Sequence, residues 1–270
     1  MQDFKIIKVA IGRVFAEVYE FLADGRNFSA WGGGDPGTAA VSHGGRDWLV
    51  QIDGSSVVLR FSEPNPFGIL DIQAFPYGGQ PGPVTPVRLY PSRDGCELCY
   101  VHFRHPEQPE EQFASAAEWL ESDLLRLKSF LEQDGPLRTT YTSSILSVSI
   151  ERPVNEVFRF LLDPRNYPKW ASVTGHRFEY RGGRDWLVDA TFGPRIVRFA
   201  EPNDYGVLDH AVFEEGEEPV LSPMRAVANE EGTLLTFTFF QRSGFTDEGF
   251  ASTAEWIATD LLAAKSLLEV

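Results

Sequence analysis

The feature that most constrains the fold of this chain is an internal repeat. Residues 9–31 align with residues 148–170 at an offset of 139, and 11 of these 23 positions are identical. The heptapeptide GGRDWLV occurs twice without change, at residues 44–50 and 182–188. A repeat of about 125 residues has the length of a domain and is far longer than a solenoid unit. The chain of 270 residues is therefore expected to fold as two similar domains.

The segment between the two copies has the composition of a linker. It begins with Gln133, Asp134, Gly135 and Pro136, and it stays polar as far as Thr142. Gly-Pro and polar clusters of this kind mark turns and connections between folded segments. We therefore predict three parts: a first domain over residues 1–133, a linker over 134–143, and a second domain over 144–270.

Each copy has the same order of predicted elements. A strand (4–11; 145–150) leads into a short helix (14–22; 154–162), and a second helical turn ends at Trp31 or Trp170. Six strand-like runs follow in the first copy, separated by Gly, Pro and Asn, near residues 38–43, 46–52, 57–63, 68–75, 86–91 and 96–103. The class is α+β: a curved antiparallel sheet of about seven strands wrapped on a long C-terminal helix, with two short helices.

The long closing helix is predicted from apolar residues that alternate at spacings of four and three. In the first copy these are Phe113, Ala117, Leu120, Leu124, Leu127 and Leu131. In the second copy they are Phe250, Ala254, Ile257, Leu261, Ala264 and Leu268. Such a stripe packs one helix face against a sheet. Asp123 and Asp260, each one turn after a tryptophan, are expected on the solvated edge of this helix.

Charge and composition disfavour several classes of partner. The formal net charge is −15, from 39 acidic and 24 basic residues, and it divides almost evenly between the halves of the chain. Binding to nucleic acid or to anionic membranes relies on Lys and Arg, so neither partner is expected. No apolar run approaches the roughly 18 residues of a membrane-spanning helix, and two cysteines do not make a disulfide scaffold. We expect a cytoplasmic protein without membrane insertion.

One run of potential metal ligands has the wrong geometry for a metal site. Cys96, Cys99, His102 and His105 are spaced by three, but the run reads as a strand. Side chains alternate faces along a strand, and Cys96 and His102 would lie about 20 Å apart. A zinc ion needs all its ligands within about 2.3 Å. No metal and no cofactor are therefore predicted.

The repeated pattern RFxEPNxxGxLD predicts two strands joined by a Pro-Asn turn. Pairing Glu63 with Gly68 would place Arg60 directly opposite Asp71, with Arg88 flanking the same aspartate from the next strand. This Arg–Asp–Arg ladder would lie on the solvent face; the alternative is a carboxylate clamp turned into the interior. The second copy repeats the pattern with Arg198, Asp209 and Arg225.

Two histidines are candidates for chemistry, because strand parity places both on the inward face. His102 is an even number of residues from Leu98 and Tyr100 and therefore lies on the same strand face as they do. His210 lies on the same face as Leu208 for the same reason. The other copy has Phe239 and Ile72 at these two positions. A buried imidazole can act as a base or as a hydrogen-bond donor near neutral pH. No nucleophile–base–acid triad can be assembled from the sequence.

Four segments of the second copy carry a resemblance to a known superfamily: residues 152–158, 163–170, 206–210 and 250–269. They resemble the helix-grip fold of the SRPBCC superfamily, which includes START domains, polyketide cyclases and birch-pollen-allergen-like proteins. The first copy departs from this pattern, since Gly25 replaces Pro164 and Ser29 replaces Pro168. The resemblance implies an apolar cavity between the sheet and the long helix of each tandem domain.

The predicted function is the binding of a small hydrophobic ligand in the cavity of one or both domains. The predicted ligand-binding residues are Trp48, Leu98, Tyr100, His102, Leu120, Leu124, Trp186, Leu208, His210, Met224, Phe237, Phe239, Ile257 and Leu261. Two alternatives remain open. One is an enzyme similar to polyketide aromatase/cyclases, with His102, Tyr100 and His210 as acid/base candidates. The other is a protein-interaction module, because chaperone-ATPase activators belong to the same superfamily.

Overall fold

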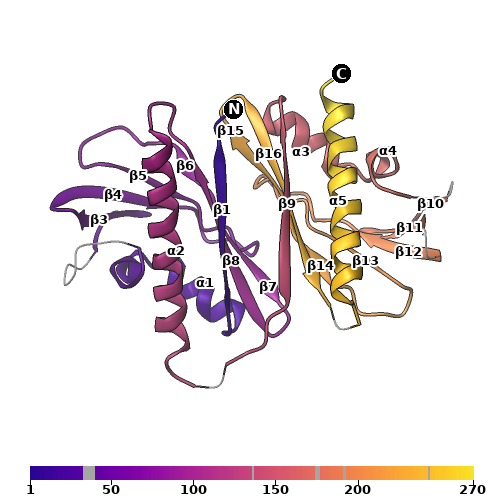
Figure 1. Cartoon of the computed structure of the whole chain (residues 1–270), viewed down its shortest axis with the longest axis horizontal. Coiled ribbons are helices and arrows are strands. Elements are labelled where there is room, and N and C mark those ends of the chain that lie inside the picture. Colours follow the sequence, from indigo (N-terminus) through magenta and orange to yellow (C-terminus); the bar gives the residue numbers. More distant parts are fainter. Residues whose placement is uncertain (33–39, 136, 174–176, 191–192, 243) are drawn as a thin grey trace. The chain divides into compact units, whose positions relative to one another are not determined.

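The computed structural model describes residues 1–32, 40–135, 137–173, 177–190, 193–242 and 244–270. The chain divides into two compact units. The first unit comprises Gln2–Thr140, and the second comprises Tyr141–Val270 together with Met1. Figure 1 labels most of the helices and strands of both units. No helix in the described ranges has the length and apolar character needed to cross a membrane.

The two units contain nearly the same elements in the same order. The first unit contains β1 (Phe4–Ile11), α1 (Phe15–Ala23), η1 (Gly25–Ala30), β2 (Val41–Gly44), β3 (Asp47–Ile52), β4 (Ser55–Phe61), β5 (Ile72–Pro76), β6 (Val84–Thr85), β7 (Val87–Ser92), β8 (Gly95–Phe103) and α2 (Glu110–Glu132). The second unit contains β9 (Thr142–Ile150), α3 (Val154–Leu162), η2 (Pro164–Asn166), α4 (Tyr167–Trp170), β10 (Phe178–Gly182), β11 (Asp185–Ala190), β12 (Gly193–Arg198), β13 (His210–Phe213), β14 (Leu221–Ser222), β15 (Met224–Asn229), β16 (Gly232–Gln241) and α5 (Asp247–Leu268).

All the strand pairings in the described residues are antiparallel, as predicted for an α+β unit. In the first unit a three-stranded sheet has the order β1-β8-β7, and a five-stranded sheet has the order β2-β3-β4-β5-β6. The second unit repeats this with β9-β16-β15 and β10-β11-β12-β13-β14. The predicted number of about seven strands was too low, because the two-residue strands β6 and β14 are too short to leave an alternating pattern.

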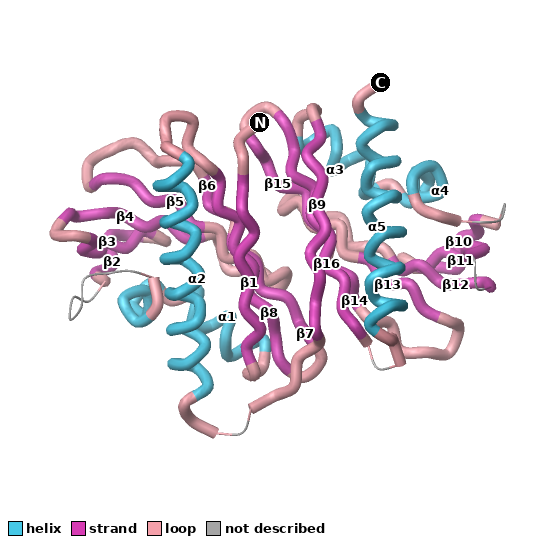
Figure 2. Tube along the Cα trace, in the orientation of Figure 1, coloured by secondary structure: helices cyan, strands magenta, loops and turns pink. Residues whose placement is uncertain are grey.

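The long helices cover one face of the three-stranded sheets. Helix α2 runs beside β1, and α5 runs beside β9, as the cyan helices and magenta strands of Figure 2 show. Their apolar stripes enter the core: Leu124 and Leu127 of α2 are buried, as are Leu261 and Ala264 of α5. Burying one leucine side chain contributes about 1.5–3 kcal/mol, so these stripes fix the helices to the sheet.

The connection between β4 and β5 is longer than the Pro-Asn pattern predicted. The side-chain oxygen of Asn65 accepts hydrogen bonds from the backbone N–H groups of Phe67 and Ile69, both at 3.0 Å. Gly68 then takes a left-handed conformation with φ of 70°. The pairing register therefore differs from the predicted one by two residues, because Phe61 pairs with Ile72, the first residue of β5, and not with Leu70.

The predicted pairing of Arg60 with Asp71 was therefore wrong. Arg60 lies opposite Gln73, and its guanidinium pairs instead with the carboxylate of Asp47 on β3, with two N–O distances of 2.7 Å. The other half of the prediction holds, because Arg88 forms an ion pair with Asp71. The second unit has the matching pairs Arg198–Asp185 and Arg225–Asp209.

These ion pairs do not form a clamp inside the core. Arg88 alternates with Val87 and Leu89, and both of these neighbours belong to the core of the first unit. Arg60 likewise lies between the core residues Leu59 and Phe61. Since successive side chains point to opposite faces of a strand, both arginines lie on the face opposite these core residues. The alternative of an inward carboxylate clamp is therefore wrong. Arg88 is nevertheless buried, as is Arg225 in the second unit, so the predicted position on the solvent face is wrong for these two arginines.

Candidate functional site

The inward face of β8 carries the first candidate site. Cys96, Leu98 and Tyr100 pack in the core of the first unit, as their shared parity predicted. One step further along this face, the ring of His102 stacks on the ring of Phe113 from α2, with centroids 5.0 Å apart and planes inclined by 24°. The inward position predicted for His102 is thus present in the structure.

The second unit has the same stacking with a different ring. Phe239 of β16 stacks on Phe250 of α5, with a centroid distance of 5.0 Å and an angle of 16°. Phe239 and Phe250 are the repeat equivalents of His102 and Phe113, both at an offset of 137. Both units therefore stack two aromatic rings between this strand and the long helix. Only in the first unit is one of the two rings an imidazole.

The other predicted ligand-binding residues divide between the two cores. Seven are buried: Leu98, Leu124, Leu208, Met224, Phe237, Phe239 and Leu261. Four are partly buried and pack against a core: Trp48, Tyr100, Trp186 and Ile257. Leu120 is half-buried on α2. The predicted set therefore lies along two separate interiors, one in each unit.

Two buried indole groups are candidate site residues that the sequence reasoning missed. Trp31 follows η1 and Trp170 ends α4, and both side chains lie in the cores. The Nε1 atom of each is buried and has no hydrogen-bond partner among the described residues. Each ring also meets an edge-on aromatic neighbour, Phe28 at 5.3 Å and Tyr167 at 5.1 Å. The sequence signal that could have found them is that a tryptophan ends the first aligned segment in both copies, residues 9–31 and 148–170.

A polar cluster in aromatic surroundings distinguishes the second unit. The ring of His210 lies 5.4 Å from that of Phe237 and 6.0 Å from that of Tyr167. Tyr167 also contacts Phe199 at 5.3 Å. The first unit has Phe28 in place of Tyr167 and Ile72 in place of His210, so its core lacks this pair of polar groups.

Burial sets the protonation state of this cluster. Burial lowers the pKa of His210, so its imidazole is neutral at pH 7. Its Nδ1 atom lies 3.3 Å from the carbonyl oxygen of Leu208. When Nδ1 carries the proton, Nε2 is left as a lone-pair acceptor or base. Burial, with a smaller contribution from Asp260, raises the pKa of the Tyr167 hydroxyl and keeps it a hydrogen-bond donor.

The helix aspartates are not fully solvated, contrary to the prediction. Burial raises the pKa of Asp123 and that of Asp260. The carboxylate of Asp260 accepts hydrogen bonds from the backbone N–H and the hydroxyl of Ser172, and that of Asp123 pairs with Arg126. In the second unit α4 packs against α5, and Ser172 just after α4 reaches Asp260, which the helical period alone did not indicate.

The two cysteines lie in different surroundings. Cys96 belongs to the core of the first unit, and Cys99 has the opposite strand parity. Burial raises the pKa of the Cys96 thiol to about 12. A thiol with this pKa is protonated at neutral pH and is a poor nucleophile. Cys96 is therefore a packing residue.

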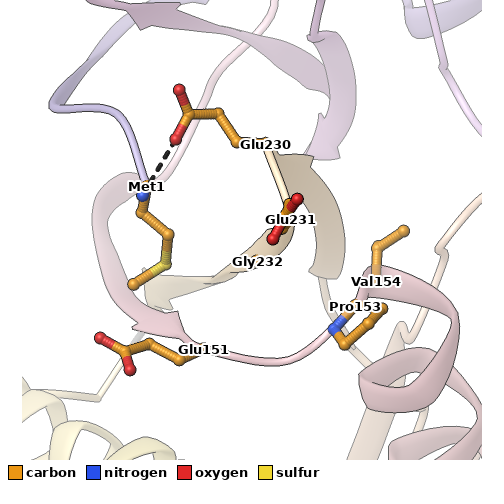
Figure 3. A pocket seen from close by; sticks show the side chains of 7 residues that line it. All are labelled: Met1, Glu151, Pro153, Val154, Glu230, Glu231 and Gly232. Atoms are coloured by element: carbon orange, nitrogen blue, oxygen red, sulfur yellow. Dashed lines mark ion pairs between the residues drawn. The ribbon is translucent and has the colours of Figure 1, made fainter.

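An open pocket of about 910 Å³ is lined by none of these residues. Figure 3 shows its lining, which consists of Met1, Glu151, Pro153, Val154, Glu230, Glu231 and Gly232. The amino group of Met1 pairs with Glu230 at 3.0 Å. Three glutamates and no aromatic side chain make this pocket unlike the apolar site that the sequence predicted.

Comparison with known proteins leaves the family unassigned. No protein-family model matches the chain, and no curated protein matches it. Among solved structures, DynU16, a protein in the dynemicin biosynthetic locus, is 19% identical, with a TM-score of 0.37 over 100% of this chain and 98% of its own. The di-domain ARO/CYC StfQ from the steffimycin pathway is 13% identical, with a TM-score of 0.37 over 98% of each chain.

A further solved structure, that of the Aha1 dimer from Colwellia psychrerythraea, is similar to one part of the chain. It is 17% identical, with a TM-score of 0.40 over 48% of this chain and 96% of its own. Likenesses at these TM-scores and identities assign neither a family nor an activity. Membership of the SRPBCC superfamily accordingly stays a prediction from the sequence motifs.

The buried imidazole predicts a pH dependence of stability. The pKa of His210 is lowered by folding, so between that pKa and the unfolded value of about 6.5 the unfolded chain binds more protons. The free energy of unfolding of the second unit should therefore decrease as the pH falls from about 7 to about 5.5. Urea titrations of the wild type and of His210→Phe check this, and the substitution should flatten the dependence. An equally steep decrease in His210→Phe would contradict the prediction.

Proposed function

We propose that each unit binds a small, largely aromatic molecule in its core, between the sheet and the long helix. The observation that carries this proposal is the pair of buried indole N–H groups, on Trp31 and Trp170, without a hydrogen-bond partner among the described residues. A buried polar group without a partner costs about 1–3 kcal/mol. Its presence at the same place in both repeats favours a role in holding a ligand over an accident of packing.

The surroundings of these donors define the ligand. Phe61 and Trp48 pack on the core that contains Trp31, and Phe199 and Tyr167 line the core that contains Trp170. Aromatic rings favour a flat, apolar partner. The N–H group adds a requirement for an acceptor, such as a carbonyl or phenolic oxygen. A polycyclic ketone or quinone satisfies both conditions.

Anthraquinone and anthracene provide the test, because they share a ring system and only anthraquinone has acceptor oxygens. We expect anthraquinone to raise the unfolding temperature and to bind more tightly than anthracene. Trp31→Phe and Trp170→Phe should each weaken anthraquinone binding at one site by about fivefold, the loss of one neutral hydrogen bond. Fluorescence quenching and native mass spectrometry give the affinity and the stoichiometry.

Trp119→Phe is the matched control, because Trp119 lies on the exposed side of α2 and undergoes the same chemical change. It should leave both affinities unchanged. If neither compound binds or stabilises the protein, binding of an aromatic ligand is the wrong function. If both compounds bind equally and the core variants have no effect, the indole groups do not recognise the ligand.

A second candidate, an enzyme similar to polyketide aromatase/cyclases, is supported by the neutral His210 beside Tyr167 in the second unit. Such an enzyme would hold a flexible chain in the aromatic core while the imidazole removes a proton. His210→Phe separates the two candidates with a polyketone substrate. Binding should survive this substitution, whereas proton transfer and turnover should be lost.

A further inference from the structure

The first unit has a positive charge on the inward face of its sheet. Lys5 of β1 pairs directly with His102 of β8 across the sheet. The ammonium nitrogen of Lys5 lies 5.3 Å from the ring centroid of Phe113, the ring on which His102 stacks. Lys5 and His102 therefore both project toward α2, at one end of the core.

No carboxylate among the described residues neutralises this charge. Lys5 forms no ion pair with any residue that the structure describes. The nearby acids Asp3 and Glu110 pair with Arg104, at 3.2 Å and 2.8 Å. The Nε2 atom of His102 is buried and also has no hydrogen-bond partner in the described part of the chain. The ammonium group of Lys5 and the Nε2 atom of His102 thus lie beside the same phenyl ring, and no described carboxylate pairs with either of them.

The second repeat shows that the fold does not require these groups. Ser144 and Phe239 pair across the sheet at the equivalent position, over Phe250. The strand pairing and the aromatic stacking are preserved there without lysine or histidine. Lys5 and His102 are therefore additions to the shared architecture, and both are of a kind that recognises an anion.

We propose that the first unit takes an aromatic carboxylic acid, with the carboxylate between Lys5 and His102 and the rings extending into the core. This inference rests on the proposed function, because it names the ligand class of the same interior. The ammonium group supplies the charge, and an Nε2–H of His102 donates a hydrogen bond to one carboxylate oxygen. The second unit, which lacks both groups, should not distinguish an acid from a neutral molecule.

The electrostatics of the pair agree with this assignment. Burial and the neighbouring charge of Lys5 both lower the pKa of His102. The imidazole is therefore neutral at pH 7, and one of its nitrogens carries a hydrogen. A carboxylate placed here gains one charge-assisted contact from Lys5 and one hydrogen bond from His102, in a place partly shielded from water.

Anthracene-2-carboxylate and anthracene-2-carboxamide are the probes, because they match in shape and differ in charge. Isothermal titration of the full chain should show one site that prefers the carboxylate by about tenfold, the effect of one charge-assisted hydrogen bond. Lys5→Met should remove most of this preference and leave the affinity for the carboxamide unchanged. His102→Phe, which installs the residue of the second repeat, should reduce the preference by a few-fold.

Lys169→Met is the control, since it removes one exposed lysine from the second unit and changes the net charge equally. It should retain the preference. If the wild type binds the two probes equally, the inference is overturned while the proposed function stands. If neither probe binds at all, the proposed function fails as well. The comparison of the two probes on the wild type decides the matter even if a variant does not fold.

Discussion

Gly206→Ala is expected to destabilise the second unit by about 2–5 kcal/mol. Gly206 has φ of 71°, where a non-glycine residue costs about 1–2 kcal/mol. A Cβ atom at this position would lie only 2.3 Å from the carbonyl oxygen of Ala226, and overpacking of this kind adds about 1–3 kcal/mol. The neighbouring backbone cannot move away easily, because the N–H of Ala226 donates to the carbonyl oxygen of Gly206 at 2.9 Å.

Gly183→Ala separates the two causes. Gly183 also has a positive φ, of 57°, but nothing lies within 4 Å of its added Cβ atom. Its loss should be limited to the conformational cost of about 1–2 kcal/mol. Gly68→Ala tests the first unit in the same way, since its Cβ would lie 2.1 Å from the carbonyl oxygen of Leu89. Thermal unfolding measures all three; equal losses for Gly206 and Gly183 would disprove the close approach.

Asp209→Ala is expected to cost about 3–5 kcal/mol, because it removes the carboxylate that pairs with a buried guanidinium. The side chain of Arg225 is only 2% exposed, and the carboxylate of Asp209 also accepts the backbone N–H of Met224 at 2.9 Å. A buried cation without its counter-charge keeps the full penalty of leaving water. Urea unfolding should show a lower midpoint with little change in slope.

Asp185→Ala is the matched control, because it breaks an Arg–Asp pair in the same unit at a more exposed place. Its partner Arg198 is 39% exposed, and pairs in such surroundings contribute about 0–1 kcal/mol. Similar losses for Asp185→Ala and Asp209→Ala would show that burial does not set the strength of these pairs. Asp71→Ala and Asp47→Ala repeat the comparison in the first unit.

Features that depend on neighbouring residues were predicted from the sequence more accurately than features that depend on contacts between distant segments. The repeat, the short helices and the long amphipathic helices were predicted well, because each depends on a local period that the residues carry themselves. The helix predicted from the apolar stripe between Phe113 and Leu131, for example, spans Glu110–Glu132. The register between β4 and β5 was wrong by two residues, because the Asn65 turn and the conformation of Gly68 set the loop length.

The candidate site shows the same limit. Strand parity correctly placed His102 and His210 on the inward faces, since alternation is a property of every strand. It could not show that Trp31 and Trp170 hold buried indole N–H groups, because their burial depends on packing against distant segments. Strand alternation also did not indicate Lys5 as a candidate site residue. Lys5 becomes a candidate only because it pairs across the sheet with His102, 97 positions further along the chain.

The sequence by itself determined that this chain is one α+β unit written twice, with an apolar helix stripe and an inward strand face in each copy. Local periodicity and internal identity are sufficient for that, because they do not depend on distant contacts. Only the tertiary structure decided which polar groups meet. Strand register and helix packing bring Lys5 to His102 in the first unit and Tyr167 to His210 in the second. Two copies with one architecture thereby acquire interiors of different chemistry.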